Sequence, residues 1–498
     1  MKYGGIAMTR KLSTMGLACL MALVMLNACC GFALAEELEP VELTVWLNDA
    51  VGTADQEVTD YINNLEEIKA LNVTIHFRKA ISGEDNAQAI GLALSAGEPC
   101  DIVFDALWKS YSLRVAEGAY IDLAPYLEKY TALKEAIPQT HWDAATINGG
   151  IYAVPTYKEA GEQWAVYLPT SFVEENNIDV AAVDELSDLT DILQMVVDDG
   201  RPGLMVTYTG SAVGGTGAIN LARFHDFSNV ISGGTVVVNR ENPTVAVNYY
   251  ETEEFREFCE LMKLWNESGY FIDDLVTREN YDEFEDESMR GMSTVSYSPQ
   301  NEIIQSTNAG YSMTPIPVTD VFVTTNACMG SAFCVTSQCE NPDRAVAFLE
   351  VWNTVPAVKN AICYGVEGLT YNLVDGQVEL VPDSYEMWGG QNWTTGNSFI
   401  SYTLVGETKD KWDVYLAWNE SAKVDPLLGF NYDSTDTSAE VAALNAALAE
   451  YLNVLVFGMV DDIDASIQAL NDALYASGLE TVLEDAQEQL DAFFASKE

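Results

Sequence analysis

Hydrophobic and polar residues alternate with two different periods in the segment 41–104. Apolar residues occupy every second position in 73–77, as in a β-strand, whereas in 58–68 they recur every three or four positions, as on one face of a helix. Short apolar strands are also predicted at 43–47 and 101–104. Between them, a helix is predicted at 85–99, and it ends at a Gly-x-Pro sequence. The order strand, helix, strand, helix, strand predicts a parallel sheet with helices on its faces.

Aromatic and polar residues lie at the ends of two of these strands. Trp46 and Asn48 come at the end of the first strand, and Trp108 follows the strand 101–104. Ligands of parallel sheets bind beyond the carboxyl ends of the strands. We therefore expect these three residues to contribute to a binding site, although a single tryptophan at such a position is also explained by packing alone.

The remaining pattern is less regular until the last sixty residues. Amphipathic helices are predicted at 186–197 and 255–270, and a strand at 291–297. A further strand precedes an Asn-Pro helix start, and that helix continues through Trp352. From Ser438 onward, three alanine- and leucine-rich helices with acidic outer faces are expected to pack as part of the structure.

Length and charge narrow the function classes. A chain of 498 residues is too long for one ordinary core, so two domains are expected. The chain has 24 lysines and arginines against 76 aspartates and glutamates, a net charge of −52. Such a surface repels nucleic acid, phosphates and anionic lipid, which leaves neutral or cationic ligands as the favoured partners. Solubility alone also explains the charge.

The N-terminus has the pattern of an export signal. Three basic residues precede or adjoin the apolar run 15–26, which is short for a transmembrane helix. Two cleavage sites compete. The sequence LNAC resembles a lipobox in which Cys29 would be lipidated, whereas ALA at 33–35 fits ordinary release. Release after Ala35 is favoured, and both sites predict an extracytoplasmic protein, secreted or lipid-anchored to the outer face of the cytoplasmic membrane, with no second membrane span.

Cysteines and histidines indicate no metal site. Six cysteines follow the signal segment, without CxxC spacing, and the three histidines are scattered. Buried free thiols are the favoured interpretation, with one or two disulfides left open. No cofactor is predicted.

Five stretches together resemble one family. They are GAYIDL (118–123), NGGIYAVPTY (148–157), SAFCVTSQCENPDRAVAFLEVW (331–352), YGVEGLTYNL (364–373) and YASGLETVLEDAQEQLDAFFASK (475–497). In this order they resemble the extracellular solute-binding proteins of bacterial ABC importers. The similarity is to the sugar-type family, in the subgroup with a long C-terminal domain of uncharacterised function.

The resemblance implies a type II periplasmic-binding-protein-like fold. Its two α/β lobes would each contain a mainly parallel sheet flanked by helices, followed by extra C-terminal helices. The expected boundaries are 1–35 for the signal peptide, 36–153 plus 312–353 for the first lobe, 154–311 plus 354–435 for the second lobe, and 436–498 for the C-terminal helices. The chain would cross between lobes near Ala153 and again near residue 310.

The same resemblance implies binding without catalysis. A solute held between the lobes would close them, and the closed monomer would dock on the transmembrane subunits of an ABC permease. The membrane would be met only through that permease or a lipid anchor. An oligosaccharide is the favoured solute, with peptides or cationic solutes second.

Candidate ligand residues follow from sugar chemistry and position. Sugar rings stack on aromatic side chains, and their hydroxyls bind carboxylates and amides. The candidates are Trp46, Asn48, Trp108, Tyr157, Glu162, Trp164, Tyr297, Tyr364, Glu367, Trp388 and Trp393. Tyr157 is expected to face the cleft just after the crossing strand 151–154, which Pro155 ends.

A secreted glycoside hydrolase with paired carboxylates is the alternative function. With 76 acidic residues, sequence spacing does not exclude such a pair. However, the sequence contains no nucleophile elbow, HExxH or Cys-His signature. A binding protein that is not an enzyme is therefore the favoured interpretation.

Overall fold

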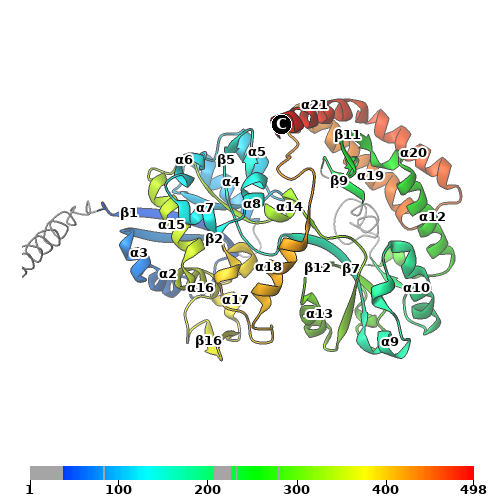
Figure 1. The fold of residues 1–498 in the computed structure, drawn as a ribbon, viewed down its shortest axis with the longest axis horizontal. Helices are drawn as coiled ribbons and strands as arrows, with labels where there is room; N and C mark the ends of the chain where they lie inside the picture. Colours follow the sequence, from blue (N-terminus) through cyan, green and yellow to red (C-terminus); the bar gives the residue numbers. More distant parts are fainter. Residues whose placement is uncertain (1–37, 82–84, 207–225, 232, 279, 498) are drawn as a thin grey trace, which may run out of the picture.

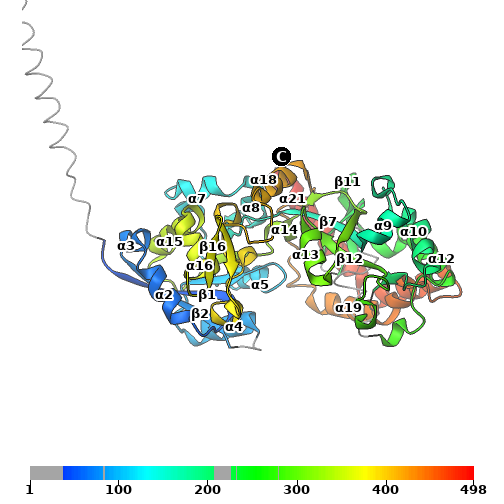
Figure 2. The same ribbon diagram turned by 90° about the horizontal axis from the view of Figure 1, so that it is seen from below.

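The computed structural model divides the chain into two lobes that lie side by side and are joined by crossing segments (Figure 1). It describes residues 38–81, 85–206, 226–231, 233–278 and 280–497. The predicted signal segment and its Cys29 lie outside these residues. Seen from below, α4 (Asn86–Ala96) and α5 (Tyr111–Ala116) belong to one lobe and α19 (Ser438–Val456) to the other (Figure 2).

The first lobe is built on five strands. They are β1 (Val41–Ala50), β2 (Val73–Ala80), β3 (Ile102–Asp105), β6 (Val154–Pro155) and β15 (Ala332–Val335), in the sheet order β2-β1-β3-β15-β6. β1 runs parallel to both β2 and β3, which confirms the parallel sheet predicted from the alternating pattern. β15 returns antiparallel to β3 and β6.

The helix α4 begins and ends where the sequence signals indicate, whereas the single helix predicted over 58–68 is divided into two short helices at residues 64–65. The carboxylate of Asp85 accepts a hydrogen bond from the Gln88 backbone N–H at 3.1 Å at the start of α4. Gly97 ends this helix in the left-handed conformation. The other main helices are α2 (Asp55–Asn63), α3 (Glu66–Ala70), α8 (Gln139–Ala144), α15 (Pro342–Thr354) and α16 (Pro356–Tyr364). Their apolar faces and the sheet form one buried cluster, the first-lobe core, which contains Ile62 and Trp352.

The two crossings lie later in the chain than predicted. β6 still belongs to the first-lobe sheet, and the chain reaches the second lobe at β7 (Gly161–Pro169). On the return, β13 (Met313–Pro317) and β14 (Phe322–Val323) both pair with β7. The chain then passes through α14 (Thr325–Cys328) to β15. The predicted boundaries at 153 and 312 are therefore wrong, because strand pairing holds 154–155 in the first lobe and 313–323 in the second.

The second-lobe sheet is mixed rather than mainly parallel. β7 runs antiparallel to β12 (Met292–Tyr297), β13 and β14. β8 (Leu204–Met205) and β18 (Lys423–Val424) add parallel pairs at the two edges. A separate antiparallel sheet contains β9 (Phe227–Asn229), β10 (Val236–Asn239) and β11 (Asn242–Asn248). The central strand is antiparallel to its neighbours because the chain enters the lobe along β7 and returns beside it.

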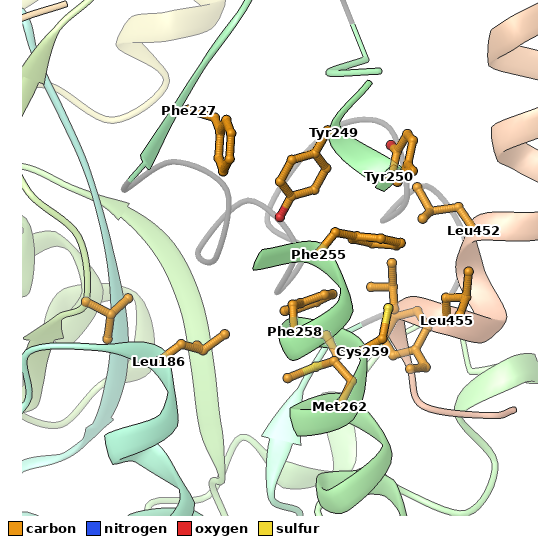
Figure 3. Packing of buried hydrophobic residues seen from close by; sticks show 14 of the residues in the cluster. Leu186, Phe227, Tyr249, Tyr250, Phe255, Phe258, Cys259, Met262, Leu452 and Leu455 are labelled. Carbon is orange, nitrogen blue, oxygen red and sulfur yellow. The ribbon is translucent and has the colours of Figure 1, made fainter. Parts of the chain in front are cut away.

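The three predicted C-terminal helices are confirmed as α19, α20 (Ile463–Ala476) and α21 (Leu479–Lys497). Leu452 and Leu455 of α19 lie against the side of α12 (Glu253–Glu267) that carries Phe255 and Cys259 (Figure 3). These residues belong to one large cluster, the second-lobe core. Gln487 of α21 also accepts a hydrogen bond from the Ala246 backbone N–H of β11 at 2.9 Å. The C-terminal helices are thus part of the second lobe.

The assignment of the whole segment 354–435 to the second lobe is wrong. Val358 and Ile362 of α16 and the side chain of Trp388 are buried in the first-lobe core. β16 (Tyr371–Val374) and β17 (Gln377–Leu380) form a hairpin after α16, and α17 (Ser384–Met387) follows. The chain returns to the second lobe only with β18, after α18 (Lys411–Ser421).

Within the described ranges, α19 alone is long and apolar enough to cross a membrane by length and composition. Leu444, Leu448, Leu452 and Leu455 are buried in the second-lobe core, so its most apolar face is covered by protein. The six cysteines that follow the signal segment are free thiols, and five of them are buried.

Candidate binding cleft between the lobes

The larger of two neighbouring cavities between the lobes has a volume of about 640 Å³ and is called the larger cavity below. One wall comes from β7, the end of β12 and α13 (Asn301–Ala309) in the second lobe. The opposite wall comes from the end of α16, the loop 390–398 and α18. Its aromatic lining consists of Tyr297, Tyr364, Tyr385, Trp393, Trp412 and Tyr415.

Hydrogen bonds hold several of these rings in place. The Trp412 indole N–H donates to the Ser401 carbonyl at 2.8 Å, and the Tyr364 hydroxyl donates to the Tyr402 carbonyl at 2.8 Å. The Trp393 indole donates to the side chain of Gln391, and 37% of the Trp393 surface remains exposed. The larger cavity therefore offers aromatic surfaces whose orientation is set before any ligand arrives.

A buried lysine of the first lobe holds the loop that carries Trp393. Lys359 on α16 is fully buried and donates to the Asn392 side-chain oxygen at 2.7 Å and to the Thr395 hydroxyl at 2.8 Å. It also reaches the Asn392 carbonyl at 3.4 Å. Because burial penalises the charged ammonium, the pKa of Lys359 is lowered to about 8. Asn392 itself lines the larger cavity, so Lys359 positions part of its wall.

Charges in the larger cavity are paired within the wall. Lys411 forms an ion pair with Glu407 at 2.5 Å, and Lys158 forms one with Glu159 at 3.3 Å. Glu162 is a further carboxylate of this cavity. The lining therefore has more acidic than basic groups.

A second cavity of about 520 Å³ adjoins the first and is called the smaller cavity below. Trp108, at the end of β3, contributes from the first lobe, and Trp164 of β7 contributes from the second. Glu162 and Asn326 line both cavities. The two cavities therefore meet at the start of β7 and the first turn of α14.

A buried ion pair lies in the wall of the smaller cavity. The Asp425 carboxylate accepts hydrogen bonds from the Ser228 hydroxyl at 2.6 Å and from the Arg240 guanidinium at 3.1 Å. Nearby, Glu162 accepts from the Thr324 hydroxyl at 2.9 Å, and burial raises the pKa of Glu162. These contacts join β7, β9, the residues that directly follow β10 and β14, and the segment before the C-terminal helices around one cavity.

Six of the predicted site residues line the two cavities. Tyr297, Tyr364 and Trp393 line the larger cavity, Trp108 and Trp164 line the smaller one, and Glu162 lines both. Asn48 instead lines a small hollow at the ends of β1 and β2, together with Asp49 and Lys109. Trp46 is partly buried and packs against residues of the first lobe.

The other three predicted residues, Trp388, Tyr157 and Glu367, line neither cavity. Trp388 is only 1% exposed, its indole donates to the Ile362 carbonyl at 2.8 Å, and the Lys79 ammonium lies 3.6 Å from its ring centroid. The prediction that Trp388 faces the cleft is therefore wrong, because its ring fills the first-lobe core.

Tyr157 and Glu367 contribute to neither cavity. The Tyr157 ring lies 4.3 Å from that of Phe399 and 5.2 Å from that of His141, measured between centroids. Glu367 is exposed in the turn after α16. The expectation that Tyr157 faces the cleft is thus corrected, since its ring packs between two neighbours.

Sequence reasoning missed the contribution of α18. Trp412 and Tyr415 on this helix line the larger cavity, and Asn419 on the same helix accepts from the Ala160 backbone N–H at 2.9 Å. The aromatic residues of the stretch KWDVYLAW (411–418) were the available signal. Without the fold, nothing in that stretch indicates which lobe or cavity it approaches.

The described residues contain no group of three or more His, Cys, Asp or Glu side chains placed to hold a metal ion. The residues that line the two cavities offer aromatic rings for stacking and amide, hydroxyl and carboxylate groups for hydrogen bonding. Such a lining suits recognition of a polyhydroxylated ligand.

Two α/β lobes joined by crossing segments, with cavities between them, define the fold of solute-binding proteins. A carbohydrate ABC transporter substrate-binding protein from Streptococcus pneumoniae is 24% identical to this chain over 468 residues, which are 92% of both sequences. Residues 426–495 match a family model described as a domain of unknown function, DUF3502.

Solved structures show the same fold. The crystal structure of an N-glycan transport solute-binding protein, NgtS, from S. pneumoniae has a TM-score of 0.79 at 22% identity and covers 92% of this chain and 100% of its own. The same protein in complex with Man1GlcNAc has a TM-score of 0.68 at 20% identity and covers 91% and 99%. The two-lobed α/β fold that the resemblance implies is thereby confirmed.

Proposed function

We propose that this protein is the extracytoplasmic substrate-binding component of an ABC importer and captures an oligosaccharide between its lobes. The observation that carries the proposal is the larger cavity, which both lobes line with aromatic rings and hydrogen-bonding side chains. The names of its relatives, a carbohydrate-binding component and an N-glycan transport protein, support the same role.

Ligand capture would work by linking the two walls. A sugar in contact with Tyr297 of the second lobe and Trp393 beside the first lobe stabilises the arrangement in which both contacts are made. A closed form produced in this way is the species that a permease would recognise. The protein binds and releases its solute without a chemical step, and it acts outside the cytoplasm, released or held by a lipid anchor.

The charge pattern supports a neutral ligand. Lys158 and Lys411, the lysines that the described residues contribute to the larger cavity, are each paired with a glutamate. A net charge of −52 further disfavours anionic solutes. A neutral oligosaccharide fits this lining better than an acidic one.

A thermal-shift screen over neutral glycans, acidic glycans and oligopeptides tests the proposal. A captured glycan should raise the melting temperature, because binding to the native state adds RT ln(1 + [L]/Kd) to its stability. Chromatography of the same mixtures should show the glycan unchanged. Appearance of shorter products would identify a hydrolase instead, and a shift with peptides alone would replace the sugar by a peptide.

Matched variants locate the binding event. Tyr297→Ala should weaken glycan binding by about 1 kcal/mol, because it removes one aromatic surface of the larger cavity. Glu367→Gln changes an exposed residue outside both cavities and should leave the affinity unchanged. Equal affinities of wild type and Tyr297→Ala would remove the larger cavity from the binding site.

A further inference from the structure

We propose that the ligand site is bipartite, so that one neutral oligosaccharide lies across both cavities and bends around the start of β7. This inference rests on the proposed function and names the ligand class more narrowly, as an extended or branched glycan. Each cavity, at about 640 and 520 Å³, falls within the range of roughly 300–1,000 Å³ that small-molecule sites occupy. Each therefore has room for its own arm of a ligand.

The two cavities are built with the same kinds of residue. The larger cavity has Trp393 beside the first lobe and Tyr297 in the second. The smaller cavity has Trp108 in the first lobe and Trp164 in the second. An aromatic side chain on each side of both cavities is what two separately stacked sugar units require.

The first-lobe tryptophan of the smaller cavity, Trp108, is exposed, and a hydrogen bond fixes its orientation. Trp108 is 55% exposed, yet its indole N–H donates to the Gly330 carbonyl at 2.8 Å. Gly330 lines the larger cavity, so this hydrogen bond spans the boundary between the two. A large apolar ring held at the boundary by its polar edge presents the rest of its surface for contact with a ligand.

The two cavities lie against opposite faces of β7 and meet at its start. Successive strand residues point to opposite faces, and accordingly Gln163 lines the larger cavity whereas Trp164 lines the smaller one. The pairing of β7 with β12 ends at Gln163 and Tyr297. In the described part of the sheet, β12 therefore does not extend beside Glu162, which pairs only with Phe322 of β14 on the other edge of β7. Because Glu162 lines both cavities, a ligand that occupies both would cross from one face of β7 to the other at this residue.

The junction offers polar partners to a bridging sugar unit. Glu162 and Asn326 line both cavities and come from β7 and α14, respectively. The Thr324 hydroxyl fixes one carboxylate oxygen of Glu162 at 2.9 Å. A carboxylate and an amide at the bend would bind the hydroxyls of the sugar that connects the two arms.

Titration calorimetry with a homologous series of neutral glycans, from disaccharide to hexasaccharide and including one branched member, tests the inference. Trp393→Ala and Trp108→Ala remove one ring from the larger and the smaller cavity, respectively. Each should weaken binding of the long or branched glycans roughly 2- to 12-fold, the effect of losing one aromatic contact. A disaccharide should respond to only one of the two variants. Tyr61→Ala, an exposed aromatic residue of α2 outside both cavities, is the matched control.

The outcomes separate this inference from the proposed function. If glycans bind to the wild type but Trp108→Ala leaves every affinity unchanged, the ligand is confined to the larger cavity and the bipartite site is wrong. Two equivalents of a hexasaccharide per protein would show two independent sites and would also overturn it. If no glycan binds to the wild type, the proposed function itself fails. Circular dichroism of the three variants checks that each is folded.

Discussion

The two lobes are assembled from the chain in different ways. The first three strands of the first-lobe sheet are successive in sequence and parallel, and most of that lobe comes from residues before Gly161. The second-lobe core instead joins β-strands and α12 with helices that lie about two hundred residues later. A lobe made from neighbouring segments can be predicted from local periodicity, whereas a lobe made from distant segments depends on which faces meet.

Both lobes contain a buried guanidinium–carboxylate pair, such as Arg114 with Asp105 in the first lobe, but the first lobe also contains a buried lysine without a carboxylate partner. In the first lobe, Lys359 is fully buried and its three hydrogen-bond acceptors are neutral. In the second lobe, Arg240 is buried beside the Asp425 carboxylate at 3.0 Å. The Lys359 ammonium can therefore lose its proton as the pH rises, whereas the Arg240 guanidinium stays charged.

The largest expected effect comes from removing one buried tryptophan in each lobe. Trp352→Ala and Trp265→Ala each empty a fully buried site and should cost about 3–5 kcal/mol. Hydrogen exchange followed by mass spectrometry should show Trp352→Ala weakening protection in β1–β3, and Trp265→Ala weakening it in α12 and α19–α21. Equal loss of protection in both lobes from either variant would show that the lobes unfold as one unit.

A smaller effect is expected from the pH dependence of Lys359. Its native pKa of about 8 lies below the ordinary value of 10.5. Below pH 8 both the native and the unfolded state carry the proton, whereas between pH 8 and 10.5 the unfolded state binds more protons, so stability rises with pH in this window. The slope is on the order of 1 kcal/mol per pH unit.

Lys359→Met is the variant that isolates this contribution. Urea unfolding of wild type and variant from pH 7 to 9.5 should give a difference in unfolding free energy that grows in favour of the wild type above pH 8. A difference that stays constant across the series would mean that Lys359 does not titrate in this range. Because Lys359 holds Asn392, glycan affinity should also fall in the variant.

The smallest expected effect on stability is the loss of one helix N-cap, which can be compared between the two lobes. Asp85 accepts from the Gln88 backbone N–H at the start of α4, and Asp462 accepts from the Ala465 backbone N–H at the start of α20, at 3.1 and 3.0 Å. Asp85→Ala and Asp462→Ala should each lower the melting temperature slightly, because each removes the side chain that accepts a hydrogen bond from the first turn of its helix. If α20 were a loosely attached appendage, Asp462→Ala would leave the melting temperature unchanged, so a shift comparable to that of Asp85→Ala is expected.

Predictions from the sequence succeeded where a signal is local. The strands β1–β3, the capped helix α4 and the three C-terminal helices each follow from periodicity and end signals. The sequence predictions failed where an element packs against or pairs with a segment that is far away in the chain. The crossings were placed too early because the sequence does not reveal that β13 and β14 pair with β7. The segment after 354 was given to the wrong lobe because its first-lobe partners lie some three hundred residues earlier.

The candidate site shows the same limit within one loop. Trp388 and Trp393 are five residues apart in a glycine-rich stretch and have the same chemistry. Trp388 is buried against Phe77, with ring centroids 5.6 Å apart, whereas Trp393 is 37% exposed in the larger cavity. Which of the two is available to a ligand depends on contacts with β2, and no local pattern records those contacts.

The sequence by itself determined the strands and helices of residues 41–104, the helical C-terminus, the acidic surface and the aromatic and polar residues from which a sugar site can be made. Only the tertiary structure decided that the second sheet is mixed, that the C-terminal helices complete the second-lobe core, and that two cavities meet at Glu162. The physical reason is that periodicity and end signals act over a few residues, whereas burial and cavity walls arise from segments that meet only when the whole chain has folded.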